Sequence, residues 1–424
     1  MIVNRVMLEL PIMANYYKLT IPSDRIERLQ YIKRMFPQAA GSSLGDEWHG
    51  GRHEALKRLN TIDIEAYNRN HNFINGSVSG LSPYIRHGCI TLKEALDNVR
   101  SRFGAQAEPF VESLAWRDYW RRVWYQLGNG IFSDIEDPKV ALGDKLLPDF
   151  IRQGITGLPC MDGFIRNLLQ DGYVHGHARK WFAAYMVHWL KVDWREAADW
   201  FENNLLDGDK GSNHLSWQWV ASLNNSKPYY FNKENLARHT GEKYCATCKV
   251  NCPFDASHEA LNEKLFGNTT PEKAKIHRVI MPEKTQISAH QAVAVFVHDE
   301  MLSSAHPLLR KPMPKIFVFD TMLHGKWPLK RIQFLADCLN ELQDVEIWIG
   351  DMREVVKARG VGQIVTQATP NAQVKAMLEP FNPIWQPEIK FTDAEISEKR
   401  LKRFSRYWDK VGPELFGDKI NIQP

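Results

Sequence analysis

Apolar residues recur at spacings of three and four from about Pro22 to Phe266, a pattern typical of helices that bury one face. No sustained two-residue alternation interrupts it, and clusters of Gly, Pro, Asn and Asp separate the periodic segments. The clearest predicted helices are Leu92–Phe103, Pro109–Leu127, Cys160–Gln170, His177–Leu190 and Trp194–Leu205. The pattern therefore predicts an all-α N-terminal part.

The pattern changes beyond residue 290. Helical patterns at Pro328–Leu342, Met352–Ala358 and Asn371–Leu378 lie between or after four short apolar runs, which are Ala292–Val297, Lys315–Phe319, Val345–Ile349 and Gln363–Gln367. Strands that alternate with helices predict a parallel sheet covered on both faces. We therefore expect a multidomain chain: an all-α domain at 1–267, a linker at 268–290 and a smaller, doubly wound α/β domain at 291–424 with a C-terminal helix.

Composition and charge restrict the class of protein. With 44% hydrophobic and 25% charged residues, the chain has the composition of a soluble globular protein. No apolar run approaches the roughly 20 residues of a membrane span, and the N-terminus lacks the features of a signal peptide. The net charge of +4 permits an anionic partner without requiring one. We expect a cytoplasmic monomer with no membrane partner.

Tryptophan is concentrated in the helical part. The chain has 14 tryptophans, and many fall between Trp116 and Trp219, which suggests an aromatic-lined interior around a ring cofactor. The α/β part contains neither GxGxxG after a strand nor GxxxxGK[ST], so neither common nucleotide-binding motif applies there.

One segment combines acidic and aromatic residues. LLDGDKGSNHLSWQW runs from Leu205 to Trp219, and its Asp207 and Asp209 flank a glycine, which alone indicates a turn with a helix cap. Arg179 lies upstream and can pair with a buried carboxylate, which is costly to bury without such a partner.

Five motifs in order resemble those of the photolyase and cryptochrome family, a likeness that covers roughly residues 50–235. They are SGLSPYIRHGCIT (79–91), SLAWRDYW (113–120), GYVHGHARKW (172–181), DWREAADWF (193–201) and LLDGDKGSNHLSWQW (205–219). The resemblance implies a helical FAD-binding domain and a blue-light-dependent flavoprotein that repairs UV pyrimidine lesions in DNA, with the strandedness of the DNA left open. A cryptochrome-like photoreceptor without repair activity is the alternative. A redox-inert nucleic-acid-binding protein with structural zinc is a third reading.

The resemblance also implies roles for single residues. Asp207 paired to Arg179 would face N3–H and O4 of the flavin ring, and Asn213 would lie at N5. Ser79, Ser82 and Arg117, with the helix that starts after Pro83, would bind the diphosphate. The full expected FAD-binding set is Tyr67, Ser79, Leu81, Ser82, Arg117, His175, Arg179, Asp207, Asp209 and Asn213.

Electron transfer and lesion binding complete the expected site. Trp217 and Trp194 match the two inner members of the family's tryptophan relay, whereas the third would fall near Val140, so the outer relay is absent or rerouted. Trp116 and Trp219 match the aromatic pair that packs on a flipped pyrimidine dimer, and Lys180 is expected to meet a phosphate or the lesion. This sequence departs from the family at two polar positions of the lesion pocket. Ser113 stands where the family has a carboxylate or amide, and Gly176 stands where it has an asparagine.

Three of the six cysteines are grouped as Cys245, Cys248 and Cys252, a spacing that suits a metal or cluster in a reducing compartment. KYCATCKVNCPFDA (243–256) resembles the cluster-binding tail of bacterial iron–sulfur photolyases, in which Cys160 would be the fourth ligand. A 4Fe-4S cluster is expected; zinc or free thiols are the alternatives.

AVFVHDE, PKIFVFD, LKRIQFLADCLNEL and VEIWIGD, within about Ala292–Lys390, resemble the opening strands and helices of the family's antenna domain. Those proteins normally carry this domain first, so the resemblance implies a permuted domain order. Any antenna chromophore is unknown.

Overall fold

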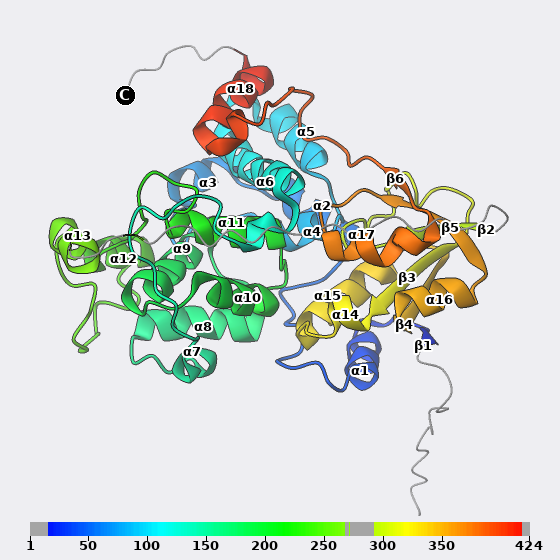
Figure 1. Cartoon of the computed structure of the whole chain (residues 1–424), viewed down its shortest axis with the longest axis horizontal. Coiled ribbons are helices and arrows are strands. Elements are labelled where there is room, and N and C mark those ends of the chain that lie inside the picture. The colour runs from blue at the N-terminus through cyan, green and yellow to red at the C-terminus, as the bar shows by residue number, and fades with distance from the viewer. Residues whose placement is uncertain (1–15, 268–270, 272–291, 418–424) are drawn as a thin grey trace, which may run out of the picture.

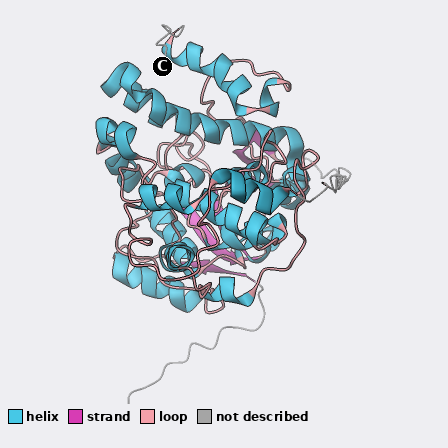
Figure 2. Cartoon of the chain, turned by 90° about the vertical axis from the view of Figure 1, so that its left-hand side faces the viewer, coloured by secondary structure: helices cyan, strands magenta, loops and turns pink. Residues whose placement is uncertain are grey.

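The computed structural model describes residues 16–267, 271 and 292–417. The predicted linker falls almost entirely outside the described residues. Helices form the N-terminal part, and a six-stranded sheet lies with its own helices in the C-terminal part (Figure 1). Seen from the side of the helical part, the strands lie behind its helices (Figure 2). Among the described helices, none combines the length and the apolar character needed to span a membrane.

All five predicted helices of the N-terminal part are present. The α-helices are α1 (Arg25–Met35), α2 (Arg52–Asn60), α3 (Ile64–Asn70), α4 (Ser82–Arg86), α5 (Leu92–Phe103), α6 (Glu108–Leu127), α7 (Asp149–Gln153), α8 (Pro159–Asp171), α9 (Gly176–Ala184), α10 (Trp194–Asn204), α11 (Lys210–Val220), α12 (Lys233–Thr240) and α13 (His258–Phe266). Local chemistry sets their ends: Thr91 and Glu94 form a capping box that starts α5. The predicted helix at 177–190 differs, because α9 passes into a π-helical turn at Tyr185–Trp189.

The sheet has the order β1-β4-β3-β2-β5-β6. Its strands are β1 (Tyr16–Leu19), β2 (Ala292–Val297), β3 (Lys315–Asp320), β4 (Val345–Gly350), β5 (Val361–Gln367) and β6 (Ile384–Gln386). The five strands from β2 to β6 are parallel, and β1 pairs with β4 in the antiparallel direction. The four predicted strands and the parallel sheet are confirmed.

Helices cover both faces of this sheet. The helices of this part are α14 (Thr321–His324), α15 (Leu329–Asn340), α16 (Met352–Ala358), α17 (Ala372–Leu378) and α18 (Phe404–Phe416). Alternate residues of β3 point to opposite sides: Phe317 and Phe319 join a core with α1 and α15, whereas Ile316 and Val318 join one with α16 and α17. The larger core continues into the helical part, so the two parts share one hydrophobic interior.

Two segments cross the predicted division of the chain. The strand β1 and the helix α1 both precede residue 267, yet they pack with the C-terminal part. The strand β1 completes the edge of the sheet, and α1 packs on α15. The C-terminal helix α18 leaves the sheet and packs on α6 of the helical part (Figure 1). Thus β1 and α1 pack with the part of the chain that follows residue 290, and α18 packs with the helical part.

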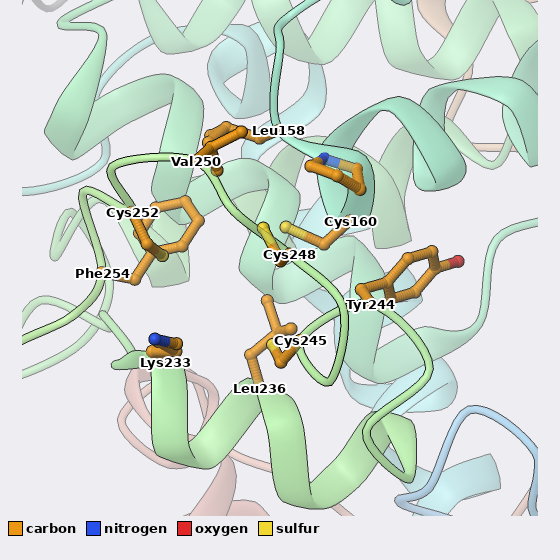
Figure 3. A pocket seen from close by; sticks show the side chains of 11 residues that line it. Leu158, Cys160, Lys233, Leu236, Tyr244, Cys245, Cys248, Val250, Cys252 and Phe254 are labelled. Carbon is orange, nitrogen blue, oxygen red and sulfur yellow. The ribbon is translucent and has the colours of Figure 1, made fainter.

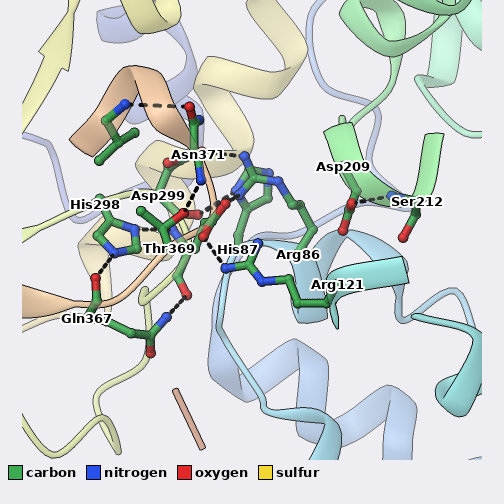
Figure 4. A network of polar contacts seen from close by, with 12 residues as sticks. Arg86, His87, Arg121, Asp209, Ser212, His298, Asp299, Gln367, Thr369 and Asn371 are labelled. Atoms are coloured by element: carbon green, nitrogen blue, oxygen red, sulfur yellow. Dashed lines mark hydrogen bonds and ion pairs between the residues drawn. The ribbon is translucent and has the colours of Figure 1, made fainter. Parts of the chain in front are cut away.

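Buried ion pairs join the two parts at the carboxyl end of β2. Asp299 Oδ2 lies 2.7 Å from Arg86 Nη2, and Glu300 Oε2 lies 2.6 Å from Arg121 Nη2 (Figure 4). Burial alone would raise the pKa of Glu300, but the guanidinium groups of Arg121 and Arg86 lower it to about 2. Buried charges of this kind need their partners, so the network links the sheet to α4 and α6.

This pairing predicts a stability that falls with acid. The folded chain holds Glu300 ionised at pH values where the unfolded chain has protonated it, so the stabilisation is full above about pH 4.5 and is lost as pH falls toward about pH 2. Urea unfolding of the wild type should show this loss, and Glu300→Gln should flatten the pH dependence in that window. An unchanged slope in the variant would contradict the assignment.

Candidate functional site

A cavity of about 570 Å³ opens among α3, α4, α6, α9 and α11. Most of the residues singled out from the sequence line it: Tyr67, Ser79, Leu81, Ser82, Trp116, Arg117, Arg179, Lys180, Asp207, Asp209, Asn213, Trp217 and Trp219. His175 and Trp194 do not line it. The fold thus brings together side chains that are far apart in the sequence, from Tyr67 to Trp219.

Asp207 is a buried carboxylate with a cationic partner. Its Oδ2 lies 3.0 Å from Arg179 Nη1, and its Oδ1 accepts a hydrogen bond from the backbone N–H of Gly208. Burial alone would raise the pKa of Asp207, but Arg179 and then Arg117 lower it below its usual value. The site therefore presents an ionised carboxylate that can accept a hydrogen bond from a ring N–H.

Asp209, two residues after Asp207, has a different role. It caps α11, accepting a hydrogen bond from the backbone N–H of Ser212, and it pairs with Arg117 of α6. The carboxylate of Asp209 therefore offsets part of the positive charge of Arg117.

Gly208, between the two aspartates, has φ +43°, and a Cβ added there would lie 2.3 Å from the guanidinium carbon of Arg331. Glycine fits this turn because Arg331 of α15 lies directly against it.

The serine-containing loop leads into α4. This helix begins at Ser82 and includes Pro83, so it starts slightly earlier than the sequence pattern indicated. Ser79, Leu81 and Ser82 all line the cavity. Tyr67, from α3, stacks on His71 with 4.5 Å between ring centroids. Hydroxyls and backbone N–H groups of this loop are suited to bind phosphate oxygens.

Asn213, expected at N5 of the flavin, and the two relay tryptophans lie on α10 and α11. Asn213 is buried, and its Nδ2 donates to the carbonyl of Ala198, which fixes the amide. Trp217 lines the cavity and packs edge-on against Phe182 and Phe201. Trp194 is buried away from the cavity, where its Nε1 donates to Asp134.

Aromatic and cationic side chains also line the cavity. Trp116 and Trp219 are half-buried and line it together with Lys180. Burial lowers the pKa of Lys180. Ser113 donates its hydroxyl to the carbonyl of Phe110, and a Cβ added at Gly176 would meet no atom within 4 Å. The two tryptophans can stack on flat rings, whereas Ser113 and Gly176 offer few polar groups to a ligand.

His175 belongs to the start of α9 rather than to the cavity wall. Its Nδ1 accepts a hydrogen bond from the backbone N–H of His177, and its Nε2 is buried without a partner in the described structure. Burial lowers the pKa of His175 to about 4, so the ring is neutral at pH 7. The structure gives it a capping role, and His177 lines the cavity instead.

Several lining residues were not singled out from the sequence. They include Trp120, Tyr173, Phe201, Ser212 and Ser216. Trp120 lies one helical turn after Trp116, and Ser216 lies three residues after Asn213, so helical spacing from a predicted site residue is the signal that could have found them. Tyr173 carried no comparable signal.

A second, small pocket brings the four predicted metal ligands together. Cys160, Cys245, Cys248 and Cys252 all line it, beside Tyr244 and Phe254 (Figure 3). Burial, with smaller contributions from the neighbouring Cys252 and Cys245, raises the pKa of Cys160 to about 12. Within the described residues, no three His, Cys, Asp or Glu side chains are arranged to hold a metal ion. The thiols thus share a pocket without forming a ready coordination sphere.

Comparison with known proteins locates the family likeness. Residues 110–260 match the family model of the FAD binding domain of DNA photolyase. The chain is 35% identical over 179 residues to a deoxyribodipyrimidine photo-lyase of Streptomyces griseus, which covers 40% of this chain and 39% of the relative. It is 31% identical over 191 residues to a cryptochrome DASH of Danio rerio, covering 42% and 37% of the two chains.

A solved cryptochrome of Synechocystis sp. PCC6803 is 24% identical, covers 49% of this chain and 47% of its own, and has a TM-score of 0.44. The chain spans about two fifths of the length of the curated relatives it matches. The family likeness therefore lies in residues 110–260, which are similar to the FAD binding domain of DNA photolyase.

Proposed function

We propose that this protein binds FAD in the helical cavity and uses blue light to repair UV pyrimidine lesions in DNA. The main observation in support is that one cavity is lined both by polar residues suited to bind FAD and by two tryptophans, Trp116 and Trp219, that can stack on bases. The relatives named photo-lyase support the reaction class.

The donor set fits FAD. Ser79, Ser82 and Arg117 would hold the diphosphate, the Asp207–Arg179 pair would hold the ring edge, and Asn213 would lie at N5. Tyr67 and Leu81 would complete the contact, and Asp209 would keep Arg117 in place. When bound, FAD would supply the light-driven transfer of an electron, and the protein supplies binding and orientation.

The remaining residues would serve the substrate and the electron supply. Trp116 and Trp219 would stack on the extruded pyrimidines, with Lys180 as the nearby cation. Trp217 and Trp194 are proposed as the electron-carrying side chains. Val140 is buried and aliphatic, so an onward route would use another residue.

A repair assay tests the proposal. Full-length protein with reduced FAD should restore intact thymines in a dimer-bearing oligonucleotide under blue light and not in the dark. Light-independent or absent restoration, with FAD bound and reduced, would reject repair and leave the photoreceptor alternative. Single-stranded and duplex substrates should be run in parallel to decide the strandedness.

The cryptochrome-like alternative rests on two positions. Ser113 turns its hydroxyl to its own helix, and Gly176 offers no side chain, so two polar contacts to a lesion are missing. Relatives named cryptochrome DASH are also among the matches.

We also propose that Cys160, Cys245, Cys248 and Cys252 hold a 4Fe-4S cluster, with zinc as the second candidate. Their shared pocket supports this, and a cation would offset the cost of ionising the buried Cys160 thiol. The side chains would have to rotate to form the site. Their thiolates would be the ligands, and the cluster would contribute a redox centre close to α8 and α12.

Metal analysis of anaerobically purified protein should find iron and acid-labile sulfide. Cys160→Ser should lower the metal content, whereas Cys89→Ser, which removes a buried thiol outside this pocket, should leave it unchanged. Zinc alone would select the structural-zinc alternative, and the absence of both metals would refute the site.

We propose that the α/β part is an antenna-like domain in a permuted order. From β2 the chain adds β3 and β4 on one side and then continues with β5 on the other side of β2. Doubly wound sheets bind ligands at such a change in strand order. The chromophore is not specified by the residues there. A cytoplasmic, monomeric state remains part of the proposal.

A further inference from the structure

The indole of Trp116 is stacked on a ring from the far end of the chain. Phe404, the first residue of α18, lies face to face with it, with ring centroids 3.7 Å apart and planes 9° from parallel. The ring of Trp408 is nearly parallel to that of Phe404, with centroids 6.2 Å apart and planes 11° from parallel. Three flat side chains, one on the cavity wall and two on the C-terminal helix, thus lie nearly parallel.

Hydrogen bonds and an ion pair hold α18 in this place. Tyr407 donates its hydroxyl to Asp118 Oδ2 at 2.6 Å, and Tyr119 donates to the carbonyl of Leu401 at 3.0 Å. Arg403 pairs with Glu136 at 2.6 Å. Phe404 is buried, so it cannot leave Trp116 without breaking these contacts and exposing apolar surface.

The two stacked rings have different relations to the cavity. Trp116 lines it and Phe404 does not. The indole face covered by Phe404 is closed to any ligand, so a base can stack only on the opposite face. Since stacking needs a fixed plane, and a tryptophan side chain rotates about two bonds, the backing ring decides how well that face is held.

We propose that Phe404 is a positioning residue, which fixes the plane of Trp116 on which an extruded pyrimidine base stacks. The helix α18 would then support the substrate pocket from outside, through Phe404, although it follows the strands of the α/β part in sequence. This inference rests on the proposed function, because it assumes that Trp116 contacts the base.

A purely structural role and a positioning role differ in what they need at residue 404. Any large apolar side chain would fill the core, but only a flat ring would hold the indole plane. Phe404→Tyr keeps the ring, and Phe404→Leu keeps apolar bulk without it. Phe416→Leu, at the other end of α18, makes the same change away from Trp116.

The experiment measures the dissociation constant for a dimer-bearing oligonucleotide in the dark, with full-length protein. Base stacking is worth about 1–3 kcal/mol, so Trp116→Ala should weaken binding about tenfold or more and Phe404→Leu about fivefold. Phe404→Tyr and Phe416→Leu should stay within about twofold of the wild type. Melting temperatures are recorded for every variant, and Phe404→Met replaces Phe404→Leu if the latter does not fold.

The outcomes separate the two claims. If Trp116→Ala weakens binding and Phe404→Leu does not, the positioning role is overturned and the proposed function stands. Equal weakening by Phe404→Leu and Phe404→Tyr also overturns it. If Trp116→Ala leaves binding unchanged, the stacking function itself is wrong.

Discussion

Asp207→Ala is expected to abolish FAD binding. The substitution leaves Arg179 facing the cavity without its carboxylate and removes the acceptor proposed for the ring N–H. Breaking a buried pair by removing one partner costs about 3–5 kcal/mol. A loss of that size in binding free energy would lower the affinity by about two to nearly four orders of magnitude, at about 1.4 kcal/mol per tenfold change. The measurement is the flavin content of the purified variant after reconstitution with excess FAD.

A second buried aspartate provides the matched control. Asp337 of α15 is also buried and pairs with Arg28 at 2.8 Å, but it does not line the cavity. Asp337→Ala should lower the melting temperature and retain FAD. Full FAD content in Asp207→Ala would show that this carboxylate does not hold the cofactor.

Asp299→Ala is expected to lower the free energy of unfolding by about 3–5 kcal/mol, because it strands a buried arginine. The side chains of Arg86 and Asp299 are only 5% and 8% exposed, and the next carboxylate oxygen, from Glu300, is 3.7 Å from Arg86. Urea unfolding followed by circular dichroism measures the loss.

The surface pair between Glu346 and Lys18 is the comparison. Both side chains are partly exposed, at 27% and 51%, so Glu346→Ala should cost only about 0–1 kcal/mol. Similar losses for Asp299→Ala and Glu346→Ala would mean that the interface network does not stabilise the joined parts.

Local pattern accounts for what could be predicted from the sequence. The bounds of α5 and α16 agree with their predicted ranges, because capping residues mark both starts: the Thr91–Glu94 box and Asp351. The four inner strands were recognisable because strands buried on both faces are continuous apolar runs. The cavity residues followed from spaced motifs, which specify chemistry at fixed positions.

Contacts between distant segments account for what could not be predicted. The strand β1 has only four residues, and its pairing with β4 depends on a partner more than 300 positions away. The stacking of Phe404 on Trp116 leaves no trace in either local pattern, because helical periodicity reports which face is buried and not what covers it. The motif gave the position of His175 but not the direction of its ring, which caps α9 in the structure, so its contact with FAD stays a prediction.

The central claim is that the cavity among α3, α4, α6, α9 and α11 holds FAD. The most direct measurement is the amount of flavin released when the purified, reconstituted protein is denatured, determined from its visible absorbance and compared with the protein concentration. We expect the wild type to release about one non-covalent FAD per chain. No flavin in folded, reconstituted protein would contradict it.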